Sequence, residues 1–162
     1  MIRSIHDFLD RWKEETEATL KIFNSLTNES LQVAIPCGRT LGRLANHIVE
    51  TVTELPSKLG LPIEEVHSNY TTVQELKTYY KKYSDQLIGA IISHWDDDML
   101  EEENNLYGDP WKKGFSLWVL LIHQTHHRGQ MTVLMRMAGI KVPGIYGPSK
   151  EEWEAWGEVA LP

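Results

Sequence analysis

A repeat of apolar side chains every 3 to 4 residues, about the 3.6-residue period of an α-helix, is the feature that most constrains the fold. It recurs in four long segments, at about residues 3–25, 40–56, 73–94 and 114–138. This spacing gathers apolar side chains on one face of a helix, which must then be buried against another element. No segment has a convincing strand pattern. The sequence therefore predicts an all-α fold, a four-helix bundle.

Capping residues and helix breakers mark the ends of these segments. Thr40 is placed as the N-cap of the second helix, which we expect to end at Pro56 or shortly after it. Thr72 and Glu75 have the spacing of a capping box at the start of the third helix. Gly139 follows the last apolar residue of the fourth helix and is expected to end it.

The C-terminal tail contains a second capping signature at Ser149. It predicts a short C-terminal helix that carries Trp153 and Trp156. Because large aromatic side chains are unfavourable in water, we expect this tail to pack against the body of the protein. Ile145 and Tyr146 would then lie over one end of the bundle.

The connecting segments are long for a helical bundle. Residues 57–71 and 95–113, the second and third connections, leave room for a crossover connection or for loops that form a pocket, since bundle connections usually have about 2–8 residues. The acidic residues 96–105 are expected to form a solvated linker, and residues 106–114 a turn before the fourth helix. Cys37 is a lone loop cysteine that we interpret as incidental.

Length, charge and cysteine content exclude several classes of protein. A chain of 162 residues is most simply one domain, residues 1–162. The net charge is −7 and there is no cluster of basic residues, so we expect no nucleic-acid partner. The longest apolar run, Leu117–Ile122, is far too short to span a membrane. A single cysteine and an N-terminus without a signal-like apolar region favour the cytoplasm.

Two histidines of the fourth segment form the core of a candidate site. His123 and His127 are four residues apart and therefore share one face of a helix. The same face is expected to carry Ser116, Val119, Leu120, Gln130, Met131, Leu134, Met137 and Ala138. A buried imidazole needs a partner. That partner can be a shared metal ion or a set of hydrogen bonds in the core, and the pair alone fits both.

A third histidine makes the metal interpretation more specific. His47 lies at the flank of the apolar stripe of the second segment, where a histidine alone is most simply a half-exposed residue at the edge of the core. If the second helix packs beside the fourth, His47 meets His123 and His127. Three imidazoles without a fourth protein ligand form an open site of the catalytic type. Such ligands suit zinc, nickel, copper, iron or cobalt.

Several polar side chains are candidates to assist this site. Gln130 is expected on the ligand face, where it can hydrogen-bond a bound water or substrate. Glu50 and Glu54 follow His47 by one and two helical turns and can orient an imidazole or act as a base, or they can form a solvated face. His126 points about 60° away from the line of the other two histidines. It is therefore either a support for the site or a surface residue.

The segments Arg39–Ile48 and His123–Gln130, followed by Gly139, resemble the DinB family of small bacterial proteins over nearly the whole chain. The resemblance implies an up-down-down-up four-helix bundle, commonly a homodimer. It also implies a divalent metal site of three histidines, usually with zinc or nickel. By motif position the metal ligands are His47, His123 and His127, and His126 is not a ligand.

The resemblance says less about activity. The family is associated with stress and DNA damage, and its relatives include transferases that use bacillithiol or mycothiol. We therefore expect a metal-dependent enzyme that acts on a small molecule, as a hydrolase or as an S-transferase using a low-molecular-weight thiol. Two alternatives remain: a non-catalytic bundle that binds a small ligand or a metal, and a bundle whose histidines are satisfied within the core. The candidate residues for catalysis are Gln130 and Glu50.

Overall fold

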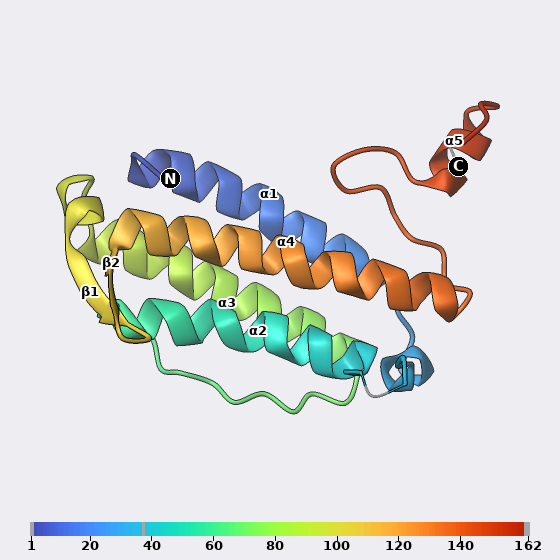
Figure 1. Ribbon diagram of the computed structural model, residues 1–162, viewed down its shortest axis with the longest axis horizontal. Helices are drawn as coiled ribbons and strands as arrows, with labels where there is room; N and C mark the ends of the chain where they lie inside the picture. Colours follow the sequence, from blue (N-terminus) through green and yellow to red (C-terminus); the bar gives the residue numbers. More distant parts are fainter. Residues whose placement is uncertain (1, 37, 161–162) are drawn as a thin grey trace.

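The computed structural model describes residues 2–36 and 38–160 (Figure 1). Its four long helices are α1 (Ile5–Asn24), α2 (Leu41–Lys58), α3 (Val73–His94) and α4 (Lys113–Met137). The predicted all-α bundle is confirmed. The interpretation of Cys37 falls on a residue outside those described. No helix within the described ranges combines the length and the hydropathy needed to cross a membrane.

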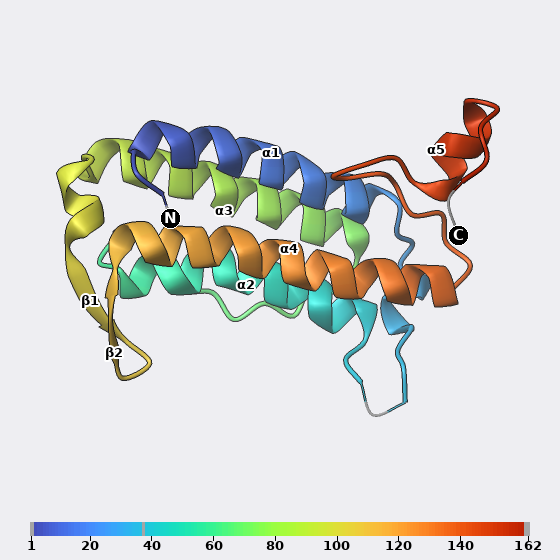
Figure 2. The ribbon, with the colours of Figure 1, turned by 45° about the horizontal axis from the view of Figure 1, so that its top comes forward.

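The helices run in the up-down-down-up order that the resemblance implied. α1 and α4 run one way, and α2 and α3 run the other way (Figures 1 and 2). Residues 59–72 have no helix and run back along the bundle to connect α2 to α3. Both α3 and α4 pack against α1 and against α2. The up-down-down-up order therefore places α2 and α4 side by side and antiparallel.

The predicted caps form the hydrogen bonds expected of them. The Thr40 hydroxyl accepts a hydrogen bond from the Arg43 backbone N–H, and a capping box joins Thr72 and Glu75. α2 continues through Pro56 and ends two residues later. The interior is filled by apolar side chains from the four helices, and the largest fully buried ones are Trp12, Tyr80, Phe8 and Phe23.

Residues 98–112 differ from the prediction. They form a short 3₁₀ helix, η2 (Asp98–Glu101), followed by an antiparallel hairpin of β1 (Glu103–Leu106) and β2 (Asp109–Lys112). The expectation of a solvated linker without a strand is wrong here. Each strand has only four residues and is largely polar, so it carries almost no alternating apolar pattern. The hairpin lies across the end of the bundle where α4 begins (Figure 2).

The tail also departs from the prediction. α5 (Lys150–Ala155) forms with the expected Ser149 capping box, but none of its residues is buried, and Trp156 is 64% exposed. The helix projects from the bundle and is held by an ion pair between Arg136 and Glu151 (Figure 1). Tyr146 does not cover an end of the bundle, because its hydroxyl bonds Thr125, at the middle of α4.

Candidate metal centre

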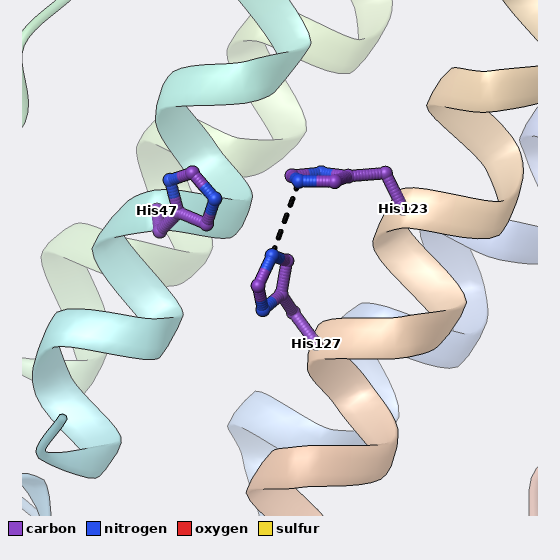
Figure 3. A group of neighbouring side chains, drawn as sticks. All are labelled: His47, His123 and His127. Carbon is purple, nitrogen blue, oxygen red and sulfur yellow. Dashed lines mark hydrogen bonds between the residues drawn. The ribbon is translucent and has the colours of Figure 1, made fainter. Parts of the chain in front are cut away.

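Three histidines converge where α2 faces α4. His47 comes from α2, and His123 and His127 come from successive turns of α4 (Figure 3). The ring centroids are 4.4–5.0 Å apart. One ring nitrogen from each residue lies within 4.8 Å of the others. The predicted meeting of these three side chains is therefore present in the structure.

The two histidines of α4 are close enough to share one ligand. Their Nε2 atoms are 3.1 Å apart. Two imidazoles on one tetrahedral zinc ion, each at about 2.0–2.1 Å, have nitrogens about 3.3 Å apart, close to the observed spacing. The same distance also suits a hydrogen bond when one Nε2 carries a proton. The geometry fits a shared metal ion without removing the hydrogen-bonded alternative.

Gln130 fixes the orientation of His127. Its Oε1 atom can only accept, so it receives the Nδ1–H of His127 at 2.8 Å. Its amide nitrogen donates to His126 Nε2 at 3.1 Å. His127 therefore presents the lone pair of Nε2 toward the centre of the cluster. In the described structure, Gln130 contacts two histidines, and His126 stands behind the cluster on the exposed side of α4.

A carboxylate lies behind His47. Glu50 Oε2 is 3.7 Å from His47 Nδ1, and the same carboxylate accepts hydrogen bonds from Arg43 and from the Ser68 backbone N–H. The Glu50 side chain is only 15% exposed, so the solvated-face interpretation is wrong for it. Its negative charge favours the tautomer of His47 that carries hydrogen on Nδ1 and offers Nε2 to the site. Glu54 instead pairs with Lys58.

Burial favours the neutral form of all three imidazoles, because it lowers the pKa of each. Desolvation first, and then the neighbouring histidines, lower the pKa of His123 to about 4. Burial and the positive charge of Arg39 also lower the pKa of His47 and His127, although the hydrogen bond to Gln130 partly opposes this for His127. Because a metal ligand must be unprotonated, this environment prepares the three side chains for coordination.

Two cavities flank the cluster along the groove between α2 and α4. A cavity of about 380 Å³ is lined by His47 and His123 and extends toward the β1–β2 hairpin. A second cavity of about 630 Å³ is lined by His127, His126 and Arg39. Volumes of this size are typical of small-molecule sites. The cluster therefore borders a cavity on each side, through His47 and His123 on one side and through His127 on the other.

The sequence model of the DinB family matches residues 1–158 of this chain. The chain belongs to the DinB family. It is 42% identical over 161 residues to the uncharacterized protein YrdA of Bacillus subtilis strain 168, covering 97% of this chain and 96% of YrdA. The predicted resemblance is confirmed.

Solved structures agree with this membership. The crystal structure of a DinB-like protein from Bacillus cereus ATCC 10987 is similar at 41% identity and a TM-score of 0.84, covering 90% of this chain and 100% of that chain. YjoA, a DinB-like protein of Bacillus subtilis, has 14% identity and a TM-score of 0.69, covering 88% and 99% of the two chains. The second likeness concerns the fold alone.

Two polar residues of α4 are more deeply buried than the histidines of this DinB-family chain. Gln124 is 0% exposed and Arg128 is 2% exposed. The buried face of α4 is therefore rotated relative to the expected one. Gln124 and Arg128 lie in the core, and the histidine cluster lies at the edge of the core that faces α2. Met137, expected on the apolar face, is exposed. Sequence reasoning missed Gln124 and Arg128, although both follow apolar residues at helical spacing.

Gln124 joins three helices beside the cluster. Its amide nitrogen donates to Thr51 Oγ1 at 2.9 Å and to the Ile48 carbonyl at 3.1 Å, both on α2. Its carbonyl oxygen accepts a hydrogen bond from the Tyr80 hydroxyl of α3 at 3.2 Å. These bonds hold α4 against α2 one turn beyond His47. They fix the distance between the helices that carry the three histidines.

Proposed function

We propose that this DinB-family protein holds a divalent metal ion, zinc or nickel, on His47, His123 and His127, and that it is a metal-dependent enzyme. The observation that carries the proposal is the convergence of three neutral imidazoles between two cavities. Among the described residues, no carboxylate or further histidine completes this cluster. A ligand set of three histidines leaves a coordination position for substrate or water, as in catalytic sites.

The reaction class follows from the chemistry of such an ion. When bound, zinc lowers the pKa of a water ligand toward 7 or holds a thiol as its thiolate. The proposed reactions are therefore hydrolysis of a small molecule or transfer to a low-molecular-weight thiol, in the cytoplasm. Gln130 and Glu50 act as positioning residues, because each contacts a ring nitrogen of a ligand histidine on the side away from the centre.

Turnover with and without metal tests the catalytic part of the proposal. Zinc- and nickel-loaded protein would be assayed with a panel of esters and amides, and with electrophiles in the presence of a low-molecular-weight thiol. We expect turnover that is lost on chelation, returns when metal is added back, and is absent from His127→Ala. Turnover that survives both chelation and this substitution would contradict the proposal.

A second candidate function is binding without turnover. Both carboxylates beside the cluster are already engaged, because Glu50 is bonded to Arg43 and Glu54 pairs with Lys58. These partners compete for carboxylate oxygens that a general base would use, which favours a protein that captures a small ligand at the metal. Recovery of a tightly held ligand in unchanged form, with no turnover in the panel, would select this second function.

A further inference from the structure

The turn of the β1–β2 hairpin carries an aromatic side chain in an unusual backbone conformation. Tyr107 has φ of 56°, and Gly108, which follows it, has φ of 95°. A two-residue turn with positive φ at both positions favours Asn, Asp or Gly. The centroids of the Tyr107 and Trp111 rings are 5.8 Å apart. Lys58 Nζ lies 5.3 Å from the centroid of the Tyr107 ring. A tyrosine held in this conformation indicates a role for its side chain.

This hairpin forms the outer wall of the cavity of about 380 Å³ beside the histidines. Tyr107 and Trp111 line its outer end, and His47 and His123 line its inner end. The walls between them come from α2 and α4 and include Leu55, Val119 and Leu120. The hairpin, which the sequence did not predict, therefore brings two aromatic rings into the same cavity as two candidate metal ligands.

The lining of this cavity has little net charge. Among the described residues that line it, Glu54 is the only carboxylate, and that side chain forms an ion pair with Lys58. Lys58 in turn lies against the Tyr107 ring, so the same ion pair contacts the hairpin. A charged ligand group gains no partner between the histidines and the hairpin, whereas an apolar group is removed from water. The cavity therefore favours a neutral apolar group.

We propose that this cavity is a subsite for an aromatic ring carried by the ligand that reaches the three histidines. The inference rests on the proposed function, because the histidines hold the other end of that ligand. Aromatic rings pair favourably at centroid distances of about 4.5–7 Å, and Trp111 and Tyr107 offer such partners. The volume suits a group of one or two rings and is far too small for a helix of a protein partner.

Two metal-chelating probes test this subsite directly. Acetohydroxamic acid and benzohydroxamic acid share the hydroxamate group and differ in a methyl group against a phenyl ring. We expect zinc-loaded protein to bind benzohydroxamic acid about tenfold more tightly in calorimetric titrations. A tenfold difference is about 1.4 kcal/mol, which burial of about 55 Å² of apolar surface supplies. Equal affinity for the two probes would overturn the subsite.

Two variants and one control show whether the preference for benzohydroxamic acid over acetohydroxamic acid arises at the hairpin. Trp111→Ala and Tyr107→Asn should each reduce the affinity ratio toward one, and Asn accepts the positive φ of residue 107, so this second variant preserves the turn. Trp118→Ala is the matched control, since Trp118 lies on α4 outside the cavity lining and should leave the ratio unchanged. A preference that survives in both hairpin variants would contradict the assignment.

Failure of the metal site can be separated from failure of the subsite. If zinc does not bind, the proposed function is wrong, and benzamide is titrated against the metal-free protein while the indole N–H signal of Trp111 is followed by NMR. A saturable shift with benzamide and none with acetamide supports the subsite alone. No shift overturns it. If zinc binds and the two hydroxamates bind equally, only the subsite is wrong.

Discussion

Two polar clusters lie on different sides of α4 and differ in how their polar atoms are satisfied. Toward α1, Arg128 forms an ion pair with Glu15 and donates to Thr19 Oγ1 at 2.9 Å. The Tyr146 hydroxyl donates to the same Glu15 carboxylate at 2.7 Å. Toward α2, one contact of 3.1 Å between His123 and His127 is the only hydrogen bond within the histidine cluster among the described residues.

The difference separates a structural role from a binding role. In the Arg128 cluster a buried positive charge meets a buried negative charge, so removal of one partner leaves the other without compensation. In the histidine cluster the imidazoles are neutral and turn ring nitrogens toward a common centre. Such a cluster gains stability from a ligand that binds only the folded state. We therefore expect substitutions in the Arg128 cluster to lower stability without changing metal binding. Substitutions in the histidine cluster should weaken metal binding with little effect on the stability of the metal-free protein.

The largest effect is expected from Arg128→Met. The substitution leaves the Glu15 carboxylate, which is only 13% exposed, without its cation. We expect the free energy of unfolding of the metal-free protein to fall by about 3–5 kcal/mol, measured by denaturant titration, while metal content per folded chain is unchanged. The double variant Glu15→Gln with Arg128→Met should recover part of the loss. A loss below about 1 kcal/mol would remove the contrast between the clusters.

Gln130→Leu should weaken metal binding and leave the stability of the metal-free protein almost unchanged. The variant removes the acceptor of the His127 Nδ1–H, which lies at 2.8 Å. Loss of such a supporting hydrogen bond typically weakens metal binding by about 10–100-fold, and the exposed position of Gln130 predicts little change in metal-free stability. Competition with a zinc-sensitive chelator measures the affinity. Gln86→Leu, on the exposed side of α3, is the control, and an equal loss of affinity there would refute the positioning role.

The smallest effect is expected from Tyr146→Phe. The substitution removes the hydroxyl that bonds Glu15 and Thr125 and retains the ring near Arg128. We expect a loss of about 1 kcal/mol in the free energy of unfolding and no change in zinc affinity. Thermal unfolding with and without zinc checks both parts. If the zinc affinity changes as well, the two clusters are coupled through α4.

The four helices follow from local signals in the sequence. Apolar spacing and the caps at Thr40 and Thr72 act over a few residues, so they can be recognised without the fold. The histidine set was also predictable, because His123 and His127 share a face, His47 lies at the flank of the second helix, and the family resemblance pointed to the same three residues. Their meeting depends on α2 lying beside α4, which the implied helix order supplies.

Which face of α4 is buried could not be predicted in the same way. Residues 118–122 are all apolar and cover the whole circumference of the helix, so several faces are nearly equivalent as the buried one. The choice depends on partners in other helices, since Gln124 bonds Thr51 and Tyr80, and Arg128 pairs with Glu15. Such distant partners leave no trace in local spacing.

The hairpin was missed for a different reason. Its strands have four residues each, and its turn places Tyr107 where Gly or Asn is usual. The outer wall of the cavity beside the histidines therefore had no signal in the sequence. The histidine cluster was predictable from spacing and resemblance, whereas the residues that line the cavity beside it were not.

The most direct test of the metal centre is the metal content of untagged protein purified without chelator or added metal, measured beside His123→Ala. We predict about one zinc or nickel ion per chain in the parent, as one open three-histidine site requires, and none in the variant, with helical content unchanged by circular dichroism. Metal retained by His123→Ala, or no metal in either protein together with unchanged stability on zinc addition, would contradict the assignment and favour histidines satisfied by their own hydrogen bonds.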